Sequence, residues 1–406
     1  MYNWKKNIIL YLTSQTISLL GSSLVQYAII WYITLETKSG LMVTISILCG
    51  FLPTLLLSPF AGVWADRHNR KLLIMLSDSV IALSTLIMTI LFMLGYKYLW
   101  LIFVISSIRA FGTAVQTPAS SSLVPSIVPV KHLTRINGIN SSLLSAAMII
   151  SPAISGVLMT IIPIHYIFLI DVVTAIIGVS ILGFFVKVPL HVKVEENQNL
   201  SYLGDMKQGF SYIKNHSYLM TFFLFISIMM FLIATPAFLT PLQITRSFGG
   251  EVWRLSAVEI CFSLGMMLGG LFMAIWGGFK NKMYTIIIAD VILGCFTIAL
   301  GVTSNFYIYL FFVAVIGVSI TMSNTPTTVL IQEKVEANYL GRVFSVLTMV
   351  NSSMMPLGMV IFGPLSDFIS IEKLLIITGF LTLIECFFMY RQKILVNAGE
   401  SILNEA

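Results

Sequence analysis

The feature that most constrains the fold of this chain is a series of twelve apolar stretches, each about 20 residues or somewhat longer. A helix of about 20 residues crosses the apolar core of a bilayer, whereas a strand of a membrane β-barrel needs only about 10. The sequence therefore predicts an all-α integral membrane protein with twelve transmembrane helices. The predicted spans cover residues 8–33, 41–64, 72–95, 98–118, 136–160, 163–186, 217–241, 255–279, 283–303, 306–330, 342–364 and 372–390.

The composition supports a lipid environment and excludes several classes of function. Hydrophobic residues make up 57% of the chain and charged residues only 10%, whereas soluble domains carry about a quarter. The net charge of +6 lies mainly in the connections, where it suits anionic lipid headgroups better than nucleic acid. The sequence contains no phosphate-binding loop, zinc-protease motif, Ser-His-Asp set or Cys-x-x-Cys pair. We therefore expect no enzyme activity, cofactor, metal, disulfide or nucleic-acid partner.

The basic residues also predict the orientation of the chain. When connections are assigned to alternating sides of the membrane, seventeen of the 23 basic residues lie on the side of the N-terminus and five on the other. Because cytoplasmic connections are enriched in Lys and Arg, both termini are expected in the cytoplasm. The first apolar run is longer than a signal-peptide core and is expected to be a retained helix. The use of Ile, Lys and Asn suggests a bacterial source, and hence the plasma membrane.

The longest connection divides the chain into two halves. Residues 1–186 are expected to form an N-terminal six-helix bundle, residues 217–390 a C-terminal six-helix bundle, and residues 391–406 a cytoplasmic tail. Within the central cytoplasmic loop, 187–216, apolar residues recur at helical spacing, which predicts a short amphipathic helix on the membrane surface. Gly204 and Gly209 leave a loose linker as the alternative.

The two halves repeat each other in sequence. Arg135 precedes the fifth span as Arg342 precedes the eleventh, at an offset of 207 residues. Asp78 in the third span corresponds to Asp290 in the ninth, at an offset of 212. A nearly constant offset of half the chain, with the same order of spans, is the parallel six-plus-six repeat found in facilitator-type transporters.

A short charged connection joins the second and third predicted spans. Its pattern resembles the signature of the major facilitator superfamily, a Gly-x-Leu-Ala-Asp-Arg-x-Gly-Arg-Lys-type loop at this place in the chain. Trp64 and Asn69 depart from the signature, and Asn is a mild replacement for a turn glycine because it tolerates left-handed backbone geometry. The resemblance implies a gating role for the matching residues, which are Gly62, Asp66, Arg67, Arg70 and Lys71.

Arg109 is the one basic residue deep inside a predicted span, where a charge is costly unless it faces a partner or water. It either forms a structural ion pair between two helices or tunes a carboxylate that carries protons. A carboxyl group buried in a membrane can exchange a proton near neutral pH because desolvation penalises its charged form. Our candidates for proton coupling are Arg109, Asp78, Asp171, Glu259, Asp290 and Glu385.

The surroundings of these carboxylates suggest alternatives to a proton-carrying role. Asp78 and Asp290 lie near predicted helix ends, where a structural role is the alternative. Asp171 and Glu385 lie in the last span of each half, which is usually peripheral in this fold. Glu259 follows Arg254 closely enough to form an ion pair with it.

Two predicted spans carry polar faces suited to line a cavity. The first span has a stripe of Ser and Gln without a carboxylate, which argues against recognition of a cationic drug there. In the fourth span, Thr113 and Gln116 share a face with Arg109. Such groups either contact substrate or join helices by hydrogen bonds. Four phenylalanines of the seventh span, among them Phe222 and Phe225, either stack on an apolar drug or face lipid. The cavity candidates are Gln15, Ser18, Ser22, Gln26, Thr113 and Gln116.

The fifth span contains a stretch similar to the superfamily's antiporter motif, Gly-Pro-x-x-Gly-Gly, with serines in place of two glycines. Small residues allow close contact between helices, and a proline bends a helix. The resemblance implies export rather than uptake. The matching residues are Ser151, Pro152, Ser155 and Gly156.

Over nearly its whole length the chain resembles drug exporters of this superfamily, the macrolide-efflux type most and tetracycline exporters next. The stretches that carry this likeness are 25–32, 50–68 and 137–152. The resemblance implies a proton/drug antiporter that exports a bulky hydrophobic antibiotic through a cavity open to each side in turn. A metabolite, lipid or siderophore transporter and a non-transporting scaffold are the alternatives. We expect a monomer whose partners are drug, protons and lipid, with assistance by another membrane protein left open.

Overall fold

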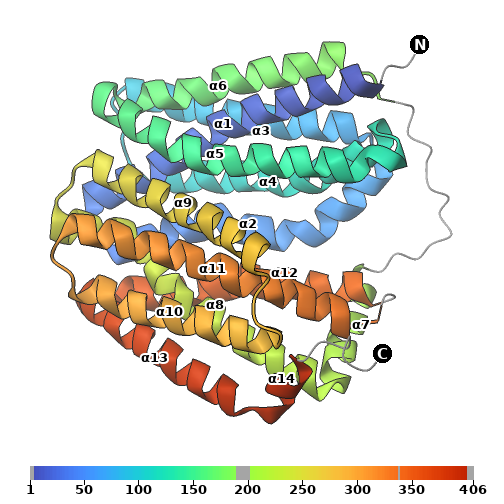
Figure 1. Ribbon diagram of the computed structural model, residues 1–406. Coiled ribbons are helices and arrows are strands. Elements are labelled where there is room, and N and C mark those ends of the chain that lie inside the picture. The colour runs from blue at the N-terminus through green and yellow to red at the C-terminus, as the bar shows by residue number, and fades with distance from the viewer. Residues whose placement is uncertain (1–3, 189–201, 337–338, 400–406) are drawn as a thin grey trace. The chain divides into compact units, whose positions relative to one another are not determined.

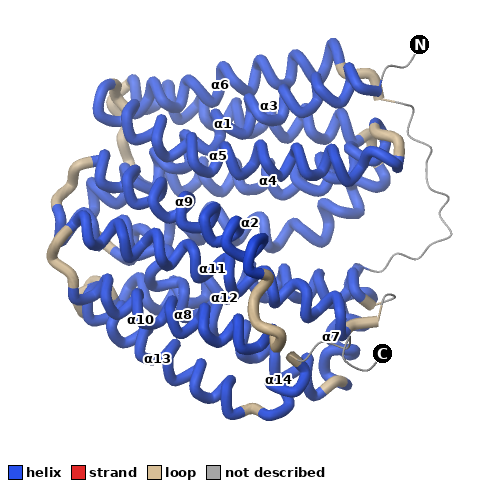
Figure 2. The backbone as a smooth tube through the Cα atoms, viewed as in Figure 1, coloured by secondary structure: helices blue, strands red, loops and turns tan. Residues whose placement is uncertain are grey.

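The computed structural model describes residues 4–188, 202–336 and 339–399, and gives side chains there except at 58–59, 62–63, 66–67, 130, 134 and 202–207. Within these ranges the chain is helical between short connections, and it contains no strand (Figure 2). The predicted all-α class is therefore confirmed. The chain forms two compact units, one of residues 1–36 and 45–199 and the other of residues 37–44 and 200–406.

The first unit holds the helices of the N-terminal half (Figure 1). The third helix, α3, packs against both α4 and α6 and lies at the centre of these contacts. A short 3-10 turn, Val130–His132, precedes the fifth helix, and a π-helical turn, Ile181–Phe185, ends the sixth. The helices are α1 (Trp4–Thr37), α2 (Gly40–Arg67), α3 (Arg70–Met93), α4 (Leu99–Ile127), α5 (Leu133–Ile161) and α6 (Ile164–Ser180).

The second unit holds the remaining helices together with residues 37–44, which connect α1 to α2. Its main contacts pair α9 with α11, α10 with α11 and α13, and α8 with α12. A π-helical turn, Ile244–Phe248, continues the eighth helix. The helices are α7 (Tyr202–Asn215), α8 (Ser217–Gln243), α9 (Val252–Trp276), α10 (Lys282–Val302), α11 (Phe306–Lys334), α12 (Leu340–Leu365), α13 (Ile371–Arg391) and α14 (Lys393–Ala398).

Eleven of the described helices are long and apolar enough to cross a membrane. The twelfth predicted span corresponds to α13, which has 21 residues but is not among the eleven. This helix carries four charged residues. Glu372 and Lys373 lie in its first turn, Arg391 lies in its last turn, and Glu385 lies between them.

The polarity of α3 is reversed relative to that of a helix in a soluble protein. Its buried stripe includes Asp78, Thr85 and Thr89, whereas its exposed stripe consists of large apolar side chains such as Leu76 and Leu83. Lipid solvates the apolar stripe, and polar groups in a membrane helix face the protein interior. The sequence thus directs polar groups of α3 inward, where the first unit gathers its charges.

A helix, α7, occupies the position of the predicted amphipathic segment. It packs against α8 and α12, and Tyr212 and Ile213 are buried in the apolar core of the second unit. The ring of Tyr212 stacks on that of Tyr339, with 4.4 Å between centroids. Burial of these side chains fixes α7 to the bundle, which a loose linker would not show.

Candidate functional site

The charged connection between α2 and α3 is a tight helix-to-helix turn. The Asn69 side chain accepts a hydrogen bond from the Leu72 N–H at 3.3 Å and caps α3, with φ −65° and ψ 108°. The expectation that Asn69 replaces a left-handed glycine is therefore wrong. Asn is favoured here because its side chain satisfies a backbone donor that the first helical turn leaves free.

Two basic residues of this connection bind backbone carbonyls of neighbouring helices. Arg70 donates to the Ser122 carbonyl at 2.8 Å, and Lys71 donates to the carbonyls of Gly183 and Val186 at 2.9 and 2.8 Å. Lys71 thereby satisfies acceptors at the C-terminal end of α6 and its π turn, where a cation is favourable. Gly62, Asp66 and Arg67 belong to the C-terminal part of α2, where the structure does not describe their side chains.

The central feature of the first unit is a buried ion pair between Arg109 of α4 and Asp171 of α6. Arg109 is 6% exposed and Asp171 is fully buried. The Asp171 carboxylate also accepts hydrogen bonds from Ser22 at 2.9 Å and from Thr85 at 3.0 Å. Arg109 further donates to the Thr85 hydroxyl and to the Ser22 carbonyl. Four helices, α1, α3, α4 and α6, therefore meet at one charged centre.

Small residues allow these helices to approach closely. A side chain at Gly21 would overlap Thr174 and the backbone of Asp171, so glycine lets α1 bring Ser22 to the carboxylate. A side chain at Gly112 would overlap Ile81 of α3. Glycine at helix contacts in membranes permits close backbone packing, and here it places Arg109 next to Thr85.

Asp78 lies on the same face of α3 as Thr85, two turns away. Its carboxylate accepts a hydrogen bond from Gln116 of α4 at 2.8 Å. Gln15 and Ser18 of α1 lie near Asp78, and Asp171 is an electrostatic neighbour. The Gln116 amide also donates to the Gln15 side-chain oxygen at 3.5 Å, and the second Asp78 oxygen has no partner in the described part of the chain. The neighbours of Asp78 on α1 and α4 are neutral, in contrast to the guanidinium that faces Asp171.

The predicted cavity candidates divide into two groups. Gln15, Ser18, Ser22 and Gln116 belong to the carboxylate centre described above. Gln26 and Thr113 are exposed on their helices, and the Thr113 hydroxyl donates to the Arg109 carbonyl of its own helix at 3.1 Å. The structure therefore brings only the first group together.

The stretch that resembles an antiporter motif lies in the middle of α5. Ser151 and Ser155 are fully buried, and Pro152 and Gly156 are also buried. The Ser155 hydroxyl donates to the Leu24 carbonyl of α1 at 3.1 Å. The small residues of this stretch thus form a contact between α5 and α1.

The acidic residues of the second unit have different surroundings. Asp290 of α10 is 3% exposed and lines a cavity. Glu385 of α13 is 5% exposed, and neither carboxyl oxygen has a partner in the described part of the chain. The expected pair between Glu259 and Arg254 is not formed: Arg254 pairs with Glu251 at 3.1 Å, and Glu259 lines a separate, mainly apolar cavity.

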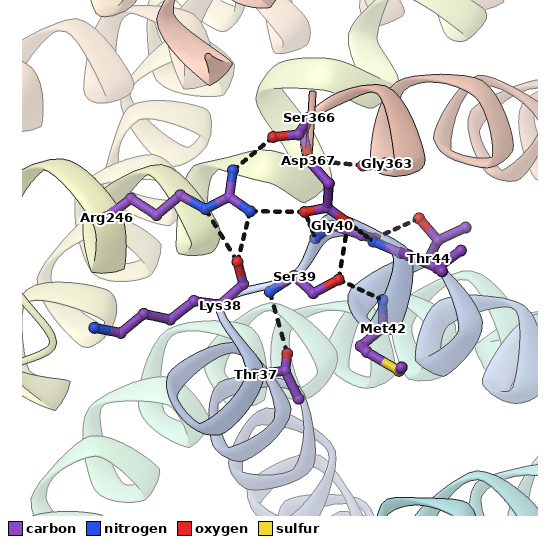
Figure 3. A network of polar contacts seen from close by, with 11 residues as sticks. Thr37, Lys38, Ser39, Gly40, Met42, Thr44, Arg246, Gly363, Ser366 and Asp367 are labelled. Carbon is purple, nitrogen blue, oxygen red and sulfur yellow. Dashed lines mark hydrogen bonds and ion pairs between the residues drawn. The ribbon is translucent and has the colours of Figure 1, made fainter. Parts of the chain in front are cut away.

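A polar network joins the connection between α1 and α2 to the rest of the second unit (Figure 3). The Asp367 carboxylate, between α12 and α13, accepts hydrogen bonds from the N–H groups of Gly40 and Leu41 at 2.7 and 3.0 Å and from the Ser39 hydroxyl at 2.8 Å. Because Gly40 begins α2, Asp367 caps that helix from a distant part of the sequence.

Arg246 completes this network. Its guanidinium donates to Asp367 at 2.7 Å, to the Lys38 carbonyl at 2.5 and 3.1 Å, and to the Ser366 carbonyl at 2.6 Å. Partial burial alone would raise the pKa of Asp367. The hydrogen bonds from Gly40, Leu41, Ser39 and Arg246 outweigh that effect and lower the pKa below its ordinary value.

Sequence reasoning did not single out Thr85, Arg246 or Asp367 for these contacts. Thr85 shares a helix face with Asp78, which is a signal that could have found it. Asp367 and Arg246 offer no such signal, because their partners in residues 38–41 lie more than 200 residues away in sequence.

Comparisons with known proteins agree with this architecture. A sequence model of the Major Facilitator Superfamily matches residues 11–359. The macrolide efflux protein A of Streptococcus pyogenes is 31% identical over 386 residues, which cover 95% of each chain. The staphyloferrin A transporter of Staphylococcus aureus is 24% identical, over 92% of this chain and 93% of the relative. A bacterial homologue of the human lysosomal transporter Spinster, solved in an inward-facing, unoccupied conformation, superposes with a TM-score of 0.72 at 13% identity, over 100% of this chain and 99% of that one.

Proposed function

Because the chain belongs to the Major Facilitator Superfamily, and is thus a multi-pass membrane transporter and not an enzyme, we propose that it exports a macrolide-like antibiotic in exchange for protons. The likeness to macrolide efflux protein A over 95% of both chains carries the choice of substrate. The proposal includes alternating access, a bacterial plasma membrane, cytoplasmic termini and a monomeric carrier. It also retains the two six-helix bundles predicted from the repeat.

The charged centre of the first unit supports the proton-coupling part of the proposal. The charges of Arg109 and Asp171 neutralise each other, whereas the side chains that surround Asp78 on α1 and α4 are neutral. A charge on Asp78 is therefore costly in a membrane interior and is removed when the carboxyl group binds a proton. We assign the exchanged proton to Asp78. Its gain and loss alter the charge of a centre that joins α1, α3, α4 and α6, and so bias their packing.

The network around Asp367 supports a second element of the mechanism. The charge pattern of the sequence assigns Lys38 and Arg246 to the outer side of the membrane. Residues 37–44 continue directly into α1 and α2, yet they are bonded to Arg246 and Asp367 of the second unit. We assign the network to holding the connection between α1 and α2 in place within the second unit, at the outer side of the membrane.

Drug susceptibility tests the proposal. A pump-deficient bacterium that expresses the chain is challenged with macrolides, tetracyclines, chloramphenicol and fluoroquinolones, with and without a protonophore. We expect protection against macrolides that the protonophore abolishes and that Asp78→Asn removes. Protection that survives the protonophore would refute proton coupling. No protection by a chain confirmed in the membrane would refute drug export.

A siderophore or other metabolite as substrate is the second candidate. The 24% identity with the staphyloferrin A transporter over most of both chains favours it over the remaining alternatives. Tetracycline export, implied by the shared signature connection, is tested by the same panel of drugs. Uptake or release of a labelled siderophore without any effect on drug susceptibility would support the siderophore alternative.

A further inference from the structure

The second unit contains a cavity of about 200 Å³ among α8, α10, α11, α12 and α13. Its lining includes polar side chains, among them Asp290, Ser323, Asn324 and Asn351. It also includes aromatic and sulfur-containing side chains of α8 and α13. Because sites for drug-sized molecules usually measure about 300–1,000 Å³, this cavity fits a chemical group and not a whole antibiotic.

The repeat explains why a cavity forms here. Thr117-Pro118 of α4 and Thr325-Pro326 of α11 are 208 residues apart, and at this offset Asn324 corresponds to Gln116. Gln116 reaches Asp78 at 2.8 Å, and Asn324, whose side chain is one methylene shorter, makes no described hydrogen bond with Asp290. Ser323 of α11 lines the same cavity as Asp290. The carboxylate of the second unit therefore faces open space where that of the first unit faces an amide.

The cavity also lacks a cation of its own. The position that corresponds to Arg109 is Gly317, where a side chain would overlap the backbone of α9. All Lys and Arg residues of α8 to α13 lie in end turns, and none of the described ion pairs includes Asp290 or Glu385. Asp290 is two turns, about 12 Å, from Lys282 at the start of α10. A buried carboxylate without a cation is costly in a membrane, and a bound cation offsets this cost.

Acceptor oxygens without a partner lie in and near the cavity. The side-chain oxygen of Asn351 is buried and has no partner in the described part of the chain. Glu385, an electrostatic neighbour of Asp290, has two buried oxygens without partners. Phe222 and Phe225 supply ring faces, which attract cations, and both are buried in the unit, not directed to lipid. The complementary ligand is a cation that donates N–H hydrogen bonds and carries apolar substituents.

We propose that this cavity binds the protonated amine of a hydrophobic substrate, with Asp290 as the counter-charge and Asn351 as a second acceptor. The proposal rests on the export function proposed above and assigns part of its substrate to the second unit. It also explains how a carrier whose first helix has no carboxylate recognises a basic drug. Asn324 determines access, because its short side chain leaves Asp290 uncovered.

Binding to the purified full-length carrier in lipid nanodiscs tests the proposal. The probes are an amine-bearing macrolide and its neutral N-acyl analogue, together with a simple lipophilic tertiary amine and its neutral isostere. Asp290→Asn should weaken binding of both amines about 30-fold or more, because it removes the charged partner from a buried pair. Binding of the neutral compounds should change little. Glu251→Gln, which alters a carboxyl group of the same unit that pairs with Arg254 and lines no described cavity, serves as the matched control and should leave all four affinities unchanged.

A second variant keeps the carboxylate. Asn324→Gln should bond Asp290 as Gln116 bonds Asp78, fill the cavity and weaken amine binding. Equal losses for amine and neutral probes in Asp290→Asn, or no loss at all, would overturn the proposal. If the tertiary amine binds through Asp290 but no macrolide binds, the cavity is supported and macrolide export is refuted. If macrolides bind wild type and Asp290→Asn equally, export is supported and the cavity assignment is refuted.

Discussion

The two units treat their buried carboxylates in opposite ways. In the first, Asp171 is paired with Arg109, and one oxygen of Asp78 accepts a hydrogen bond from Gln116 while the other has no described partner. In the second, Gly317 stands at the position of Arg109 and Asn324 at that of Gln116, and Asp290 borders a cavity. The same helical framework therefore holds a carboxylate paired with an arginine in one half and a carboxylate at an open cavity in the other. The difference comes from two positions of one repeated helix: α4 has Arg109 and Gln116, whereas α11 has Gly317 and Asn324.

The largest expected effect comes from breaking the centre of the first unit. Arg109→Ala leaves Asp171 buried without its cation, and loss of one partner of a buried pair costs about 3–5 kcal/mol of stability. We expect a large drop in the free energy of unfolding, measured by chemical denaturation in mixed micelles, and loss of efflux. The double variant Arg109→Ala/Asp171→Ala removes both charges and should recover much of the stability. If the single variant is as stable as wild type, the ion pair does not hold the helices together.

Loss of the ion pair between Asp367 and Arg246 in the second unit should lower the stability of the fold by a smaller amount, and this amount should depend on pH. The pKa of Asp367 is lowered in the network, so the network adds stability above its ordinary pKa of 3.8 and loses it as pH falls through the lowered value. Thermal unfolding of wild type and Asp367→Asn should therefore differ at about pH 6 and converge towards about pH 3. The charged group paired with Asp367 is Arg246, which stays charged throughout, and Glu372 lines the same cavity as both. A difference that does not depend on pH would contradict the assigned charge.

The smallest expected effect concerns Glu385, whose oxygens have no partner to lose. Glu385→Gln keeps the size of the side chain and removes only its titrating group, so the free energy of unfolding should change by about 0.5 kcal/mol or less. The matched variant in the first unit, Asp171→Asn, should cost several times more because it leaves Arg109 unpaired. Equal costs in the two units would remove the contrast between them.

Much of the fold could be predicted from the sequence, because a bilayer imposes long apolar helices and the repeat fixes their order. Arg109 and Asp78 could be identified as unusual because a charge inside an apolar stretch is visible in one dimension. Their partners could not, since helical periodicity groups residues on one helix but does not say which helices meet. Asp171 illustrates this limit: its place in the last span of the half suggested the periphery, and the structure pairs it with Arg109.

Long apolar helices in two repeated halves, with acidic groups and one arginine deep inside a span, can be read from the amino-acid order alone. Helix packing is needed to know which carboxylate faces the arginine, which accepts a hydrogen bond from an amide, and which borders a cavity. It also decided that Asp367 caps α2, a contact between residues 327 positions apart. The physical reason is that apolar burial in lipid depends on composition and period, whereas hydrogen bonds and ion pairs depend on atoms brought within about 3 Å by packing.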